Sequence, residues 1–328
     1  MKHQGIVTLF AFLLSAPILV GAQDSETNQL AARIELHAIQ SLTLSDEQLL
    51  KGDASGKPVT VSGQLRIAQG SARLPTVIMI HGSGGISANI DLWSTEFNQM
   101  GISTFVVDGF TGRGLTTVNT DQALLGRLNL MLDGYRALEV LAKHPQVDRA
   151  RIVLMGFSRG GQATLYASLR RFHQTWNKSG VDFAAYIPFY PDCMTTYLSD
   201  TDVVNRPIRI FHGSVDDYDP VAPCKAYVQR LRSGGHDIEL TEYANAAHGF
   251  DNPLNASPPT AAKDSQTVRR CTIREEPMGT LINAATKQPF TYKDSCVERG
   301  PHLGYDASAA HAARQAVRQF LRTVVKLN

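Results

Sequence analysis

Charge of one sign, cysteine and long apolar runs are all scarce in this sequence, and each scarcity excludes a class of protein. With 32 Lys and Arg against 30 Asp and Glu, the formal net charge is only +2, which excludes the basic surface of a nucleic-acid-binding protein. Four cysteines in 328 residues are too few for a small disulfide-based scaffold. Hydrophobic residues make up 43% and charged residues 19%, a balance that favours a folded globular chain over a disordered one.

The one long apolar run lies at the N-terminus. Lys2 precedes the largely apolar segment 6–20, and the small residues Gly21 and Ala22 follow it. Such a run is short for a transmembrane helix but typical of the core of a signal peptide. We therefore expect residues 1–22 to be a signal peptide cleaved after Ala22, with a retained anchor as the alternative. The cleaved protein should be periplasmic or secreted, without stable membrane insertion, in a compartment where disulfides persist.

The rest of the chain, residues 23–328, alternates between predicted strands and helices. Continuous apolar runs such as 76–80 and 152–155 are typical of strands buried on both faces. The alternation predicts a single α/β domain with a mostly parallel sheet and helices on both faces. Residues 251–305, rich in Pro, Ser, Thr and Asn, are too long for an ordinary connection, so we interpret them as an insertion. Further strands are expected at 33–44, 59–67, 104–107, 184–189, 208–211 and 238–243, and helices from Ser45 and at 91–100, 121–143, 161–172, 222–232 and 307–325.

A serine in a tight turn is the first candidate for chemistry. The segment Gly156-Phe157-Ser158-Arg159-Gly160 reads G-x-S-x-G and lies between a predicted strand and a predicted helix. A nucleophile elbow requires that context, because small neighbours permit the sharp turn that exposes the serine hydroxyl. We expect Ser158 to be a nucleophile rather than an ordinary turn serine.

An acid and a histidine follow the serine, each just after a predicted strand. We favour Asp216 as the acid over its neighbours Asp217 and Asp219, which have the ordinary interpretation of turn or cap residues. The order serine, acid, histidine is that of the α/β-hydrolases and differs from the chymotrypsin-like and subtilisin-like orders. We expect His248 to take and return the proton of Ser158, while Asp216 orients the imidazole.

A glycine-rich loop is the expected source of oxyanion stabilisation. The segment His81-Gly82-Ser83-Gly84-Gly85 directly follows the strand at 76–80. The backbone N–H groups of Ser83 and Arg159 should form an oxyanion hole, with Gly84 as the alternative to Ser83. Phosphate binding is disfavoured because the loop lacks the lysine of a P-loop. Side chains and backbone donors suffice for this chemistry, so we expect no metal and no organic cofactor.

Together these segments resemble the dienelactone hydrolase family of α/β-hydrolases. The founding members carry cysteine at the elbow, whereas this chain carries Ser158, which favours general carboxylic ester or lactone hydrolysis over action on dienelactone itself. The resemblance implies a small-molecule ester or lactone substrate. It also implies that the Arg-Gly pair at Arg113 closes one wall of the pocket, although an arginine there more often pairs with a structural acid. The candidate pocket residues are Gly84, Phe110, Arg113 and Tyr190.

Two other functions stay open at this point. One is a peptidase or amidase on the same fold, which we rank lower because the chain has no room for a propeller-sized extra domain. The other is a non-catalytic binding protein on a hydrolase scaffold, which would have no need of Ser158, Asp216 and His248 together.

The four cysteines are expected to form two disulfides after export. Cys193 and Cys224 should both lie at the carboxyl edge of neighbouring strands, where they can pair. Cys271 and Cys296 would then pair within the insertion. Four cysteines permit three connectivities, of which we prefer this one. None lies at the elbow, so a thiol mechanism is rejected.

Overall fold

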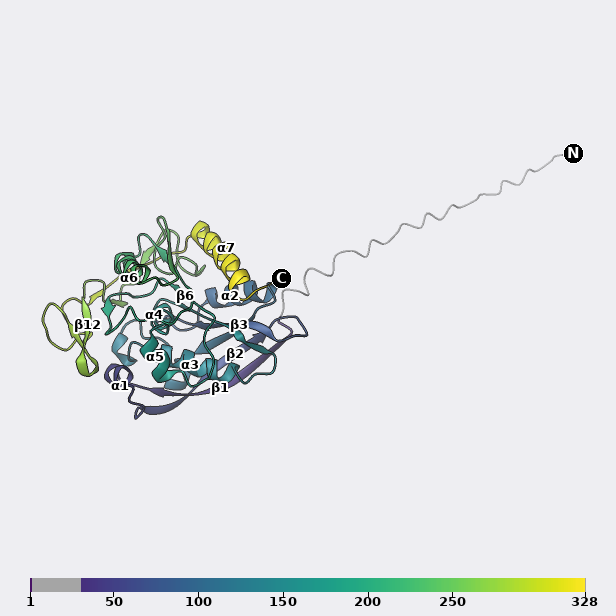
Figure 1. Ribbon diagram of the computed structural model, residues 1–328. Coiled ribbons are helices and arrows are strands. Elements are labelled where there is room, and N and C mark those ends of the chain that lie inside the picture. Colours follow the sequence, from purple (N-terminus) through teal and green to yellow (C-terminus); the bar gives the residue numbers. More distant parts are fainter. Residues whose placement is uncertain (2–30, 328) are drawn as a thin grey trace.

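An eight-stranded, mostly parallel sheet forms the centre of the computed structural model, which describes Met1 and residues 31–327 (Figure 1). Apart from Met1, the predicted signal peptide and its cleavage site lie outside the described residues. The two N-terminal strands pair antiparallel with each other and with the sheet, and all other neighbours are parallel. The predicted α/β architecture is therefore confirmed. In spatial order the strands are β1 (Arg33–Thr43), β2 (Lys57–Ile67), β4 (Ser103–Asp108), β3 (Leu74–Ile80), β5 (Val147–Phe157), β6 (Ala185–Phe189), β8 (Ile208–Gly213) and β9 (Ile238–Tyr243).

Helices cover both faces of the sheet, and the apolar strands divide their side chains between two cores. In β3, Val77 and Met79 belong to one core while Ile78 and Ile80 belong to the other, as the two-residue period of a strand requires. Helices α2 and α7 pack in the first core, and α3 to α6 pack in the second (Figure 1). The helices are α1 (Asp46–Lys51), α2 (Ala88–Gln99), α3 (Asn129–Leu141), α4 (Arg159–Tyr166), α5 (Arg170–Trp176), α6 (Val221–Ser233) and α7 (Ala307–Val324).

Two helix boundaries differ from the sequence-based prediction. The helix expected at 121–143 begins only at Asn129, whose side chain hydrogen-bonds the backbone of Leu44 and so fixes the start of α3. The preceding residues form a loop with the short 3-10 helix η3 (Gln122–Leu124). The helix expected at 161–172 is two helices, because Leu169 leaves the helical path in an extended conformation and bridges to Val203. The expected capping box at Ser45 is present at the start of α1.

The segment 251–305 consists of short strands and loops attached to the carboxyl edge of the sheet. Its strands form three small sheets, one of which incorporates β7 (Thr195–Thr196) from the loop after β6. Among the described residues, no helix is long and apolar enough to cross a membrane. The remaining short elements are β10 (Thr260–Ala261), β11 (Gln266–Thr267), β12 (Ile273–Glu276), η4 (Pro277–Gly279), β13 (Thr280–Asn283), β14 (Glu298–Arg299), β15 (His302–Leu303) and η2 (Thr111–Arg113).

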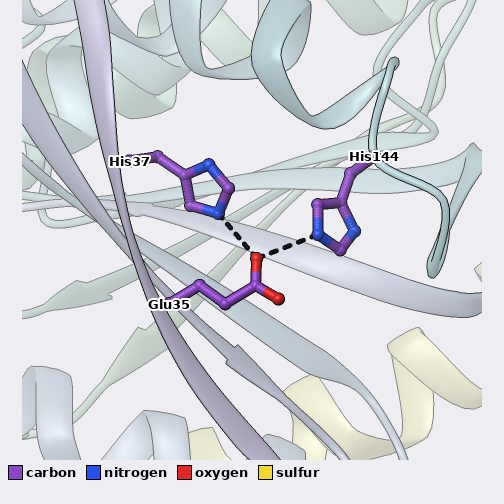
Figure 2. A group of neighbouring side chains, drawn as sticks. All are labelled: Glu35, His37 and His144. Carbon is purple, nitrogen blue, oxygen red and sulfur yellow. Dashed lines mark hydrogen bonds and ion pairs between the residues drawn. The ribbon is translucent and has the colours of Figure 1, made fainter.

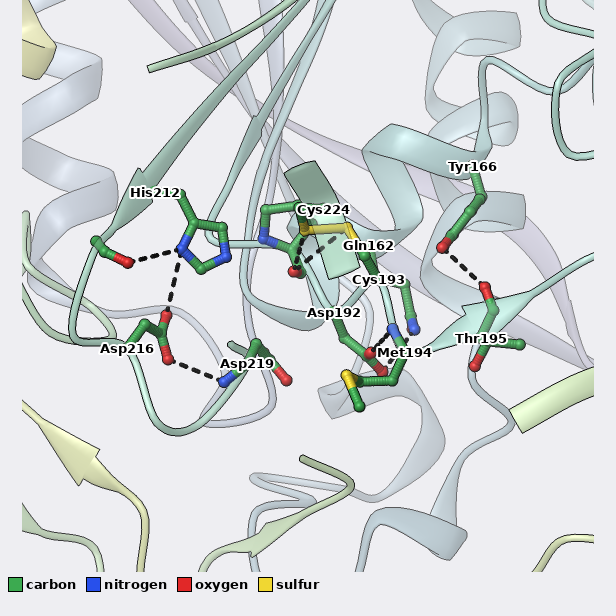
Figure 3. Close-up of a disulfide and its surroundings, with 12 residues drawn as sticks. Gln162, Tyr166, Asp192, Cys193, Met194, Thr195, His212, Asp216, Asp219 and Cys224 are labelled. Carbon is green, nitrogen blue, oxygen red and sulfur yellow. Dashed lines mark hydrogen bonds and ion pairs between the residues drawn. A yellow bond between two sulfur atoms is a disulfide. The ribbon is translucent and has the colours of Figure 1, made fainter. Parts of the chain in front are cut away.

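Both disulfides have the predicted connectivity. Cys193–Cys224 joins the loop after β6 to the first turn of α6, close to the loop that carries Asp216 (Figure 3). Cys271–Cys296 closes the insertion on itself.

Loss of the Cys193–Cys224 bridge should lower stability. The bridge spans 31 residues of sequence, so the chain-entropy argument assigns it about 3 kcal/mol of unfolding free energy. A Cys193→Ala/Cys224→Ala variant should therefore unfold at lower urea concentration than the wild type, as followed by far-UV circular dichroism. The same experiment on the wild type with and without reductant is the control. Unchanged midpoints in both comparisons would contradict a stabilising role for this bridge.

Candidate active site

Ser158 occupies a sharp turn between β5 and α4. Its backbone has φ 54° and ψ −118°, a conformation that residues with a side chain seldom adopt. The turn needs glycine on both sides, since a Cβ on Gly156 would lie 2.1 Å from the Gly160 carbonyl oxygen and one on Gly160 would lie 2.2 Å from that of Ile80. The sequence G-x-S-x-G therefore follows from close backbone contacts. Its result is a serine hydroxyl at the N-terminus of a helix, where the dipole favours negative charge.

The structure brings Ser158, His248 and Asp216 into one hydrogen-bonded chain. His248 Nε2 lies 2.9 Å from Ser158 Oγ, and His248 Nδ1 lies 2.8 Å from Asp216 Oδ2. The other Asp216 oxygen accepts hydrogen bonds from the backbone N–H groups of Tyr218 and Asp219, both at 2.9 Å. All three side chains come from loops at the carboxyl edge of the sheet. The arrangement can remove a proton from the serine and stabilise the resulting imidazolium.

Of the three neighbouring acids, only Asp216 lies within hydrogen-bonding distance of His248. Asp217 faces the insertion, where it accepts hydrogen bonds from Arg269 and from the backbone and ring of His302. Asp219 lies 3.9 Å from His248 Nδ1, beyond hydrogen-bonding distance. Burial raises the pKa of Asp219 well above its ordinary value, and the negative charge of Asp192 adds to the effect. Asp219 therefore favours its protonated form more than an exposed aspartic acid does.

Two aromatic rings hold the imidazole of His248 in place. Tyr218 stacks on it with ring centroids 4.6 Å apart, and Tyr190 meets it edge-on at 4.7 Å. Tyr190 is itself fixed by a 2.6 Å hydrogen bond to the buried Asp251, which also accepts one from Trp93. Sequence reasoning missed Asp251, because only the fold brings α2, β6 and the histidine loop together.

The glycine-rich loop after β3 is anchored beside the elbow. His81 is buried; its Nε2 accepts a hydrogen bond from Gly109 N–H (3.1 Å), so its Nδ1–H donates to the Gly82 carbonyl (2.8 Å). Burial lowers the pKa of His81 and keeps the ring neutral. A Cβ on Gly82 would lie 3.2 Å from Ser158 Cβ, so the loop runs directly past the nucleophile candidate. His81 thus holds the glycine-rich loop against the loop after β4.

Gln122 is a second residue that sequence reasoning missed, and it joins four segments around the site. Its side-chain oxygen accepts hydrogen bonds from Ser83 Oγ (3.1 Å) and Arg159 Nη1 (2.5 Å), and its amide donates to the Tyr218 hydroxyl (3.3 Å). Its backbone N–H donates to Gln266 of the insertion. The Arg159 side chain is therefore an internal anchor. Its backbone N–H is free of helical partners, because Arg159 is the first residue of α4.

Two of the candidate pocket residues lie outside the cavity above Ser158. The buried guanidinium of Arg113 pairs with Asp133 and donates to the carbonyls of Gly109 (2.6 Å) and Leu42 (2.8 Å). Arg113 thus ties the loop after β4 to β1 and α3, and it has no substrate-facing role in this conformation. Phe110 is buried and packs against the His81 ring with centroids 4.4 Å apart.

A cavity of about 270 Å³ opens over Ser158. The other two candidate pocket residues, Gly84 and Tyr190, line it. The glycine-rich loop forms one wall, and Asn255 and Leu303 of the insertion form part of another. The insertion is held against the histidine loop, since Gly304 N–H donates to the His248 carbonyl (3.1 Å). No Asp, Glu, Lys or Arg side chain of the described residues lines this cavity.

Comparison with known proteins agrees with this geometry. The sequence profile described as Dienelactone hydrolase family matches residues 62–274, well over half of the chain. The chain belongs to the dienelactone hydrolase family. It is accordingly a hydrolase, and the resemblance inferred from its motifs is confirmed.

Solved structures of this family share the fold at low sequence identity. A protein of Klebsiella pneumoniae assigned as a dienelactone hydrolase has a TM-score of 0.54 at 14% identity, over 88% of this chain and 98% of its own. A dienelactone hydrolase-like promiscuous phosphotriesterase from metagenomic libraries has a TM-score of 0.56 at 15% identity, over 89% of this chain and 98% of its own. A search of curated proteins found no match.

The electrostatics of His248 predict how the activity of this dienelactone hydrolase family member depends on pH. Burial lowers the pKa of His248, but the charge and hydrogen bond of Asp216 outweigh it and raise the pKa above its ordinary value of about 6.5. A general base must be neutral, so kcat/KM should fall as the pH drops through this raised pKa. Initial rates on a neutral ester between about pH 5 and pH 9 should therefore show an acid limb with a midpoint above about 6.5. A flat profile from pH 5 to pH 8 would contradict the role of His248.

Proposed function

We propose that this protein hydrolyses carboxylic esters or lactones through an acyl-enzyme on Ser158. The observation that carries the proposal is the continuous chain of hydrogen bonds from Asp216 through His248 to Ser158, at 2.8 Å and 2.9 Å. Family membership supports hydrolysis as the reaction class. Peptidases and amidases use the same arrangement, so the substrate panel below separates them from an esterase, whereas a non-catalytic binding protein has no need of it.

In the proposed mechanism, Ser158 Oγ attacks the carbonyl carbon while His248 Nε2 takes its proton. Asp216 holds the imidazole in the required orientation and stabilises its positive charge. The backbone N–H groups of Ser83 and Arg159 would stabilise the oxyanion, and His248 would then protonate the leaving alcohol. Water, activated by the same histidine, releases the acid from Ser158.

The substrate is proposed to be small and uncharged. The cavity of about 270 Å³ is slightly smaller than typical pockets for drug-sized ligands, which hold about 300–1,000 Å³. A separate polar cavity beside Ser158 holds only about 30 Å³, about the volume of one water molecule. Both of its arginines already have partners: Arg127 pairs with Asp192, which also accepts a hydrogen bond from Gln162 (2.9 Å), and Arg159 donates to Gln122. A substrate carboxylate would have to compete with these partners, because of the two described lining guanidinium groups only the Nε atoms lack a hydrogen-bond partner.

A panel of matched acyl compounds tests both the reaction and the substrate class. Nitrophenyl butyrate and nitrophenyl hemisuccinate have acyl chains of similar length, but only the second ends in a carboxylate. We expect kcat/KM to be at least about 10-fold higher for the butyrate, because the buried carboxylate would lack a partner. Equal or faster hydrolysis of the hemisuccinate would contradict a neutral substrate. Faster hydrolysis of butyryl nitroanilide would favour an amidase, and no turnover of any compound would favour a binding protein.

We also propose that the protein is exported, with residues 23–328 forming one α/β-hydrolase domain that carries the insertion at 251–305. Two disulfides support a periplasmic or extracellular location, since they persist in oxidising compartments. The segment 6–20 supports a cleavable signal peptide. The N-terminal sequence of the protein purified from the extracytoplasmic fraction would test this, and Gln23 is the expected first residue.

A further inference from the structure

Two histidines and a glutamate converge at the antiparallel edge of the sheet, away from the candidate active site. Glu35 and His37 lie two residues apart on β1, so both side chains are on the same face of the strand. His144 approaches them from the turn between α3 and β5 (Figure 2). The Nε2 atoms of both histidines lie 3.0 Å from the same oxygen, Glu35 Oε2. Three side chains from two distant parts of the sequence are thus aimed at one point.

The donor set and its spacing suit a divalent transition metal. The three ligand atoms all lie within 4.8 Å of one another. A tetrahedral zinc ion with bonds of about 2.0–2.2 Å holds its ligands about 3.3–3.5 Å apart, so shifts of an ångström or less would create the site. Two imidazoles and one carboxylate form a common zinc ligand set, and the fourth position would be open to water.

We propose that Glu35, His37 and His144 bind a zinc ion or a similar divalent transition metal. Access is open, since the side chains of Glu35 and His37 are each 22% exposed and that of His144 is 10% exposed. In the part of the chain that the structure describes, Arg33 pairs with Glu35 Oε1, so Oε2 is held only by the two histidines. No local sequence pattern points to this site, because His144 is far from Glu35 and His37 along the chain.

Metal binding requires a change of tautomer in both histidines, because Nε2 of each donates to Glu35 Oε2 in the metal-free form. His144 Nδ1 accepts a long hydrogen bond from Gln146 N–H (3.3 Å), so the proton of the neutral ring lies on Nε2 and is donated to Glu35. In the metal-bound form that proton moves to Nδ1, and the bond to Gln146 is given up. Protons compete with the metal for both imidazoles, so affinity should fall at acid pH.

The proposed metal would act on stability and not on hydrolysis. It would fasten the edge strand β1 to the turn before β5, which is 109 residues from Glu35 in sequence. Ser158 follows the opposite end of β5, an 11-residue strand of about 35 Å that begins just after the turn with His144. A ligand that binds only the folded state raises the unfolding temperature by mass action.

Titration of the chelator-treated, full-length mature protein with zinc chloride tests the proposal. Calorimetry should show one site of low-micromolar or tighter affinity, and zinc should raise the unfolding temperature. His37→Gln and Glu35→Gln should each weaken binding at least 10-fold and abolish the temperature shift. His311→Gln, which changes an exposed histidine on α7, is the matched control and should bind zinc as the wild type does.

Cobalt provides a second, spectroscopic measurement, which in the wild type needs no variant. Cobalt(II) bound to the wild type should give the visible absorption of a tetrahedral site, and hydrolysis of a short ester should be unchanged by chelator. Zinc binding of equal strength in wild type and His37→Gln, or no binding to the wild type, would overturn the proposal. So would cobalt absorption that survives in both His37→Gln and His144→Gln.

Discussion

Ser158→Ala is expected to lower kcat/KM for a short neutral ester by about 10⁶-fold, the scale of loss when a triad serine is removed. The variant keeps His248 and Asp216 but has no atom that can form the acyl-enzyme. The residual rate would come from the backbone donors and the cavity alone. This loss is measured from initial rates with nitrophenyl butyrate. The protein concentration must be high enough to detect the residual activity of the variant.

The control for this variant is Ser308→Ala, which removes an exposed hydroxyl on α7. It should hydrolyse the ester at the wild-type rate. The unfolding temperature of Ser158→Ala should be at least that of the wild type, because alanine at φ 54° adds no backbone strain beyond that of serine. A loss of less than about 100-fold with a correctly folded variant would show that another residue carries the nucleophile.

Asp216→Asn is expected to lower kcat by about 10⁴-fold, because an amide holds the imidazole in the wrong tautomer. The variant also removes the charge that raises the pKa of His248, so the acid limb of any residual activity should move to lower pH. Rates and pH profiles on the same ester measure both effects. The second effect separates loss of the acid partner from general damage to the loop.

The neighbouring acids provide matched controls. Asp217→Asn changes a carboxylate that bonds Arg269 and His302 and should alter kcat only a few-fold. Asp219→Asn should also have a small effect, because Asp219 makes no hydrogen bond to His248 and burial raises its pKa, which favours the neutral form. A loss for Asp219→Asn as large as that for Asp216→Asn would contradict the assignment of a single acid partner.

The parts of the fold that sequence predicts are those with local causes. The strand β3 is a continuous apolar run because helices cover both of its faces, and its side chains divide between two cores. The turn at Ser158 could be predicted from the motif G-x-S-x-G, because there is no room for a side chain at Gly156 or Gly160. Cys193 and Cys224 were predictable as a pair because parallel strands bring their carboxyl ends to one edge.

The parts that sequence could not predict depend on partners far apart in the chain. Gln122 was assigned to a helix, although in the fold it connects the glycine-rich loop, the elbow and the insertion. The motif around Arg113 predicts a residue in the wall of the pocket, but in the fold Arg113 pairs with Asp133, a buried acid on α3. Asp251 gave no signal at all, because its role comes from Tyr190 and Trp93.

Labelling with a fluorophosphonate, followed by peptide mass spectrometry, tests the proposed role of Ser158 most directly. The reagent reacts only with a serine that a neighbouring base has activated, so it reports on Ser158 and His248 together. We predict one adduct per chain, on the peptide that contains Ser158, and greatly slowed labelling in Asp216→Asn. An unlabelled protein, or an adduct on any other residue, would contradict the proposed serine hydrolase.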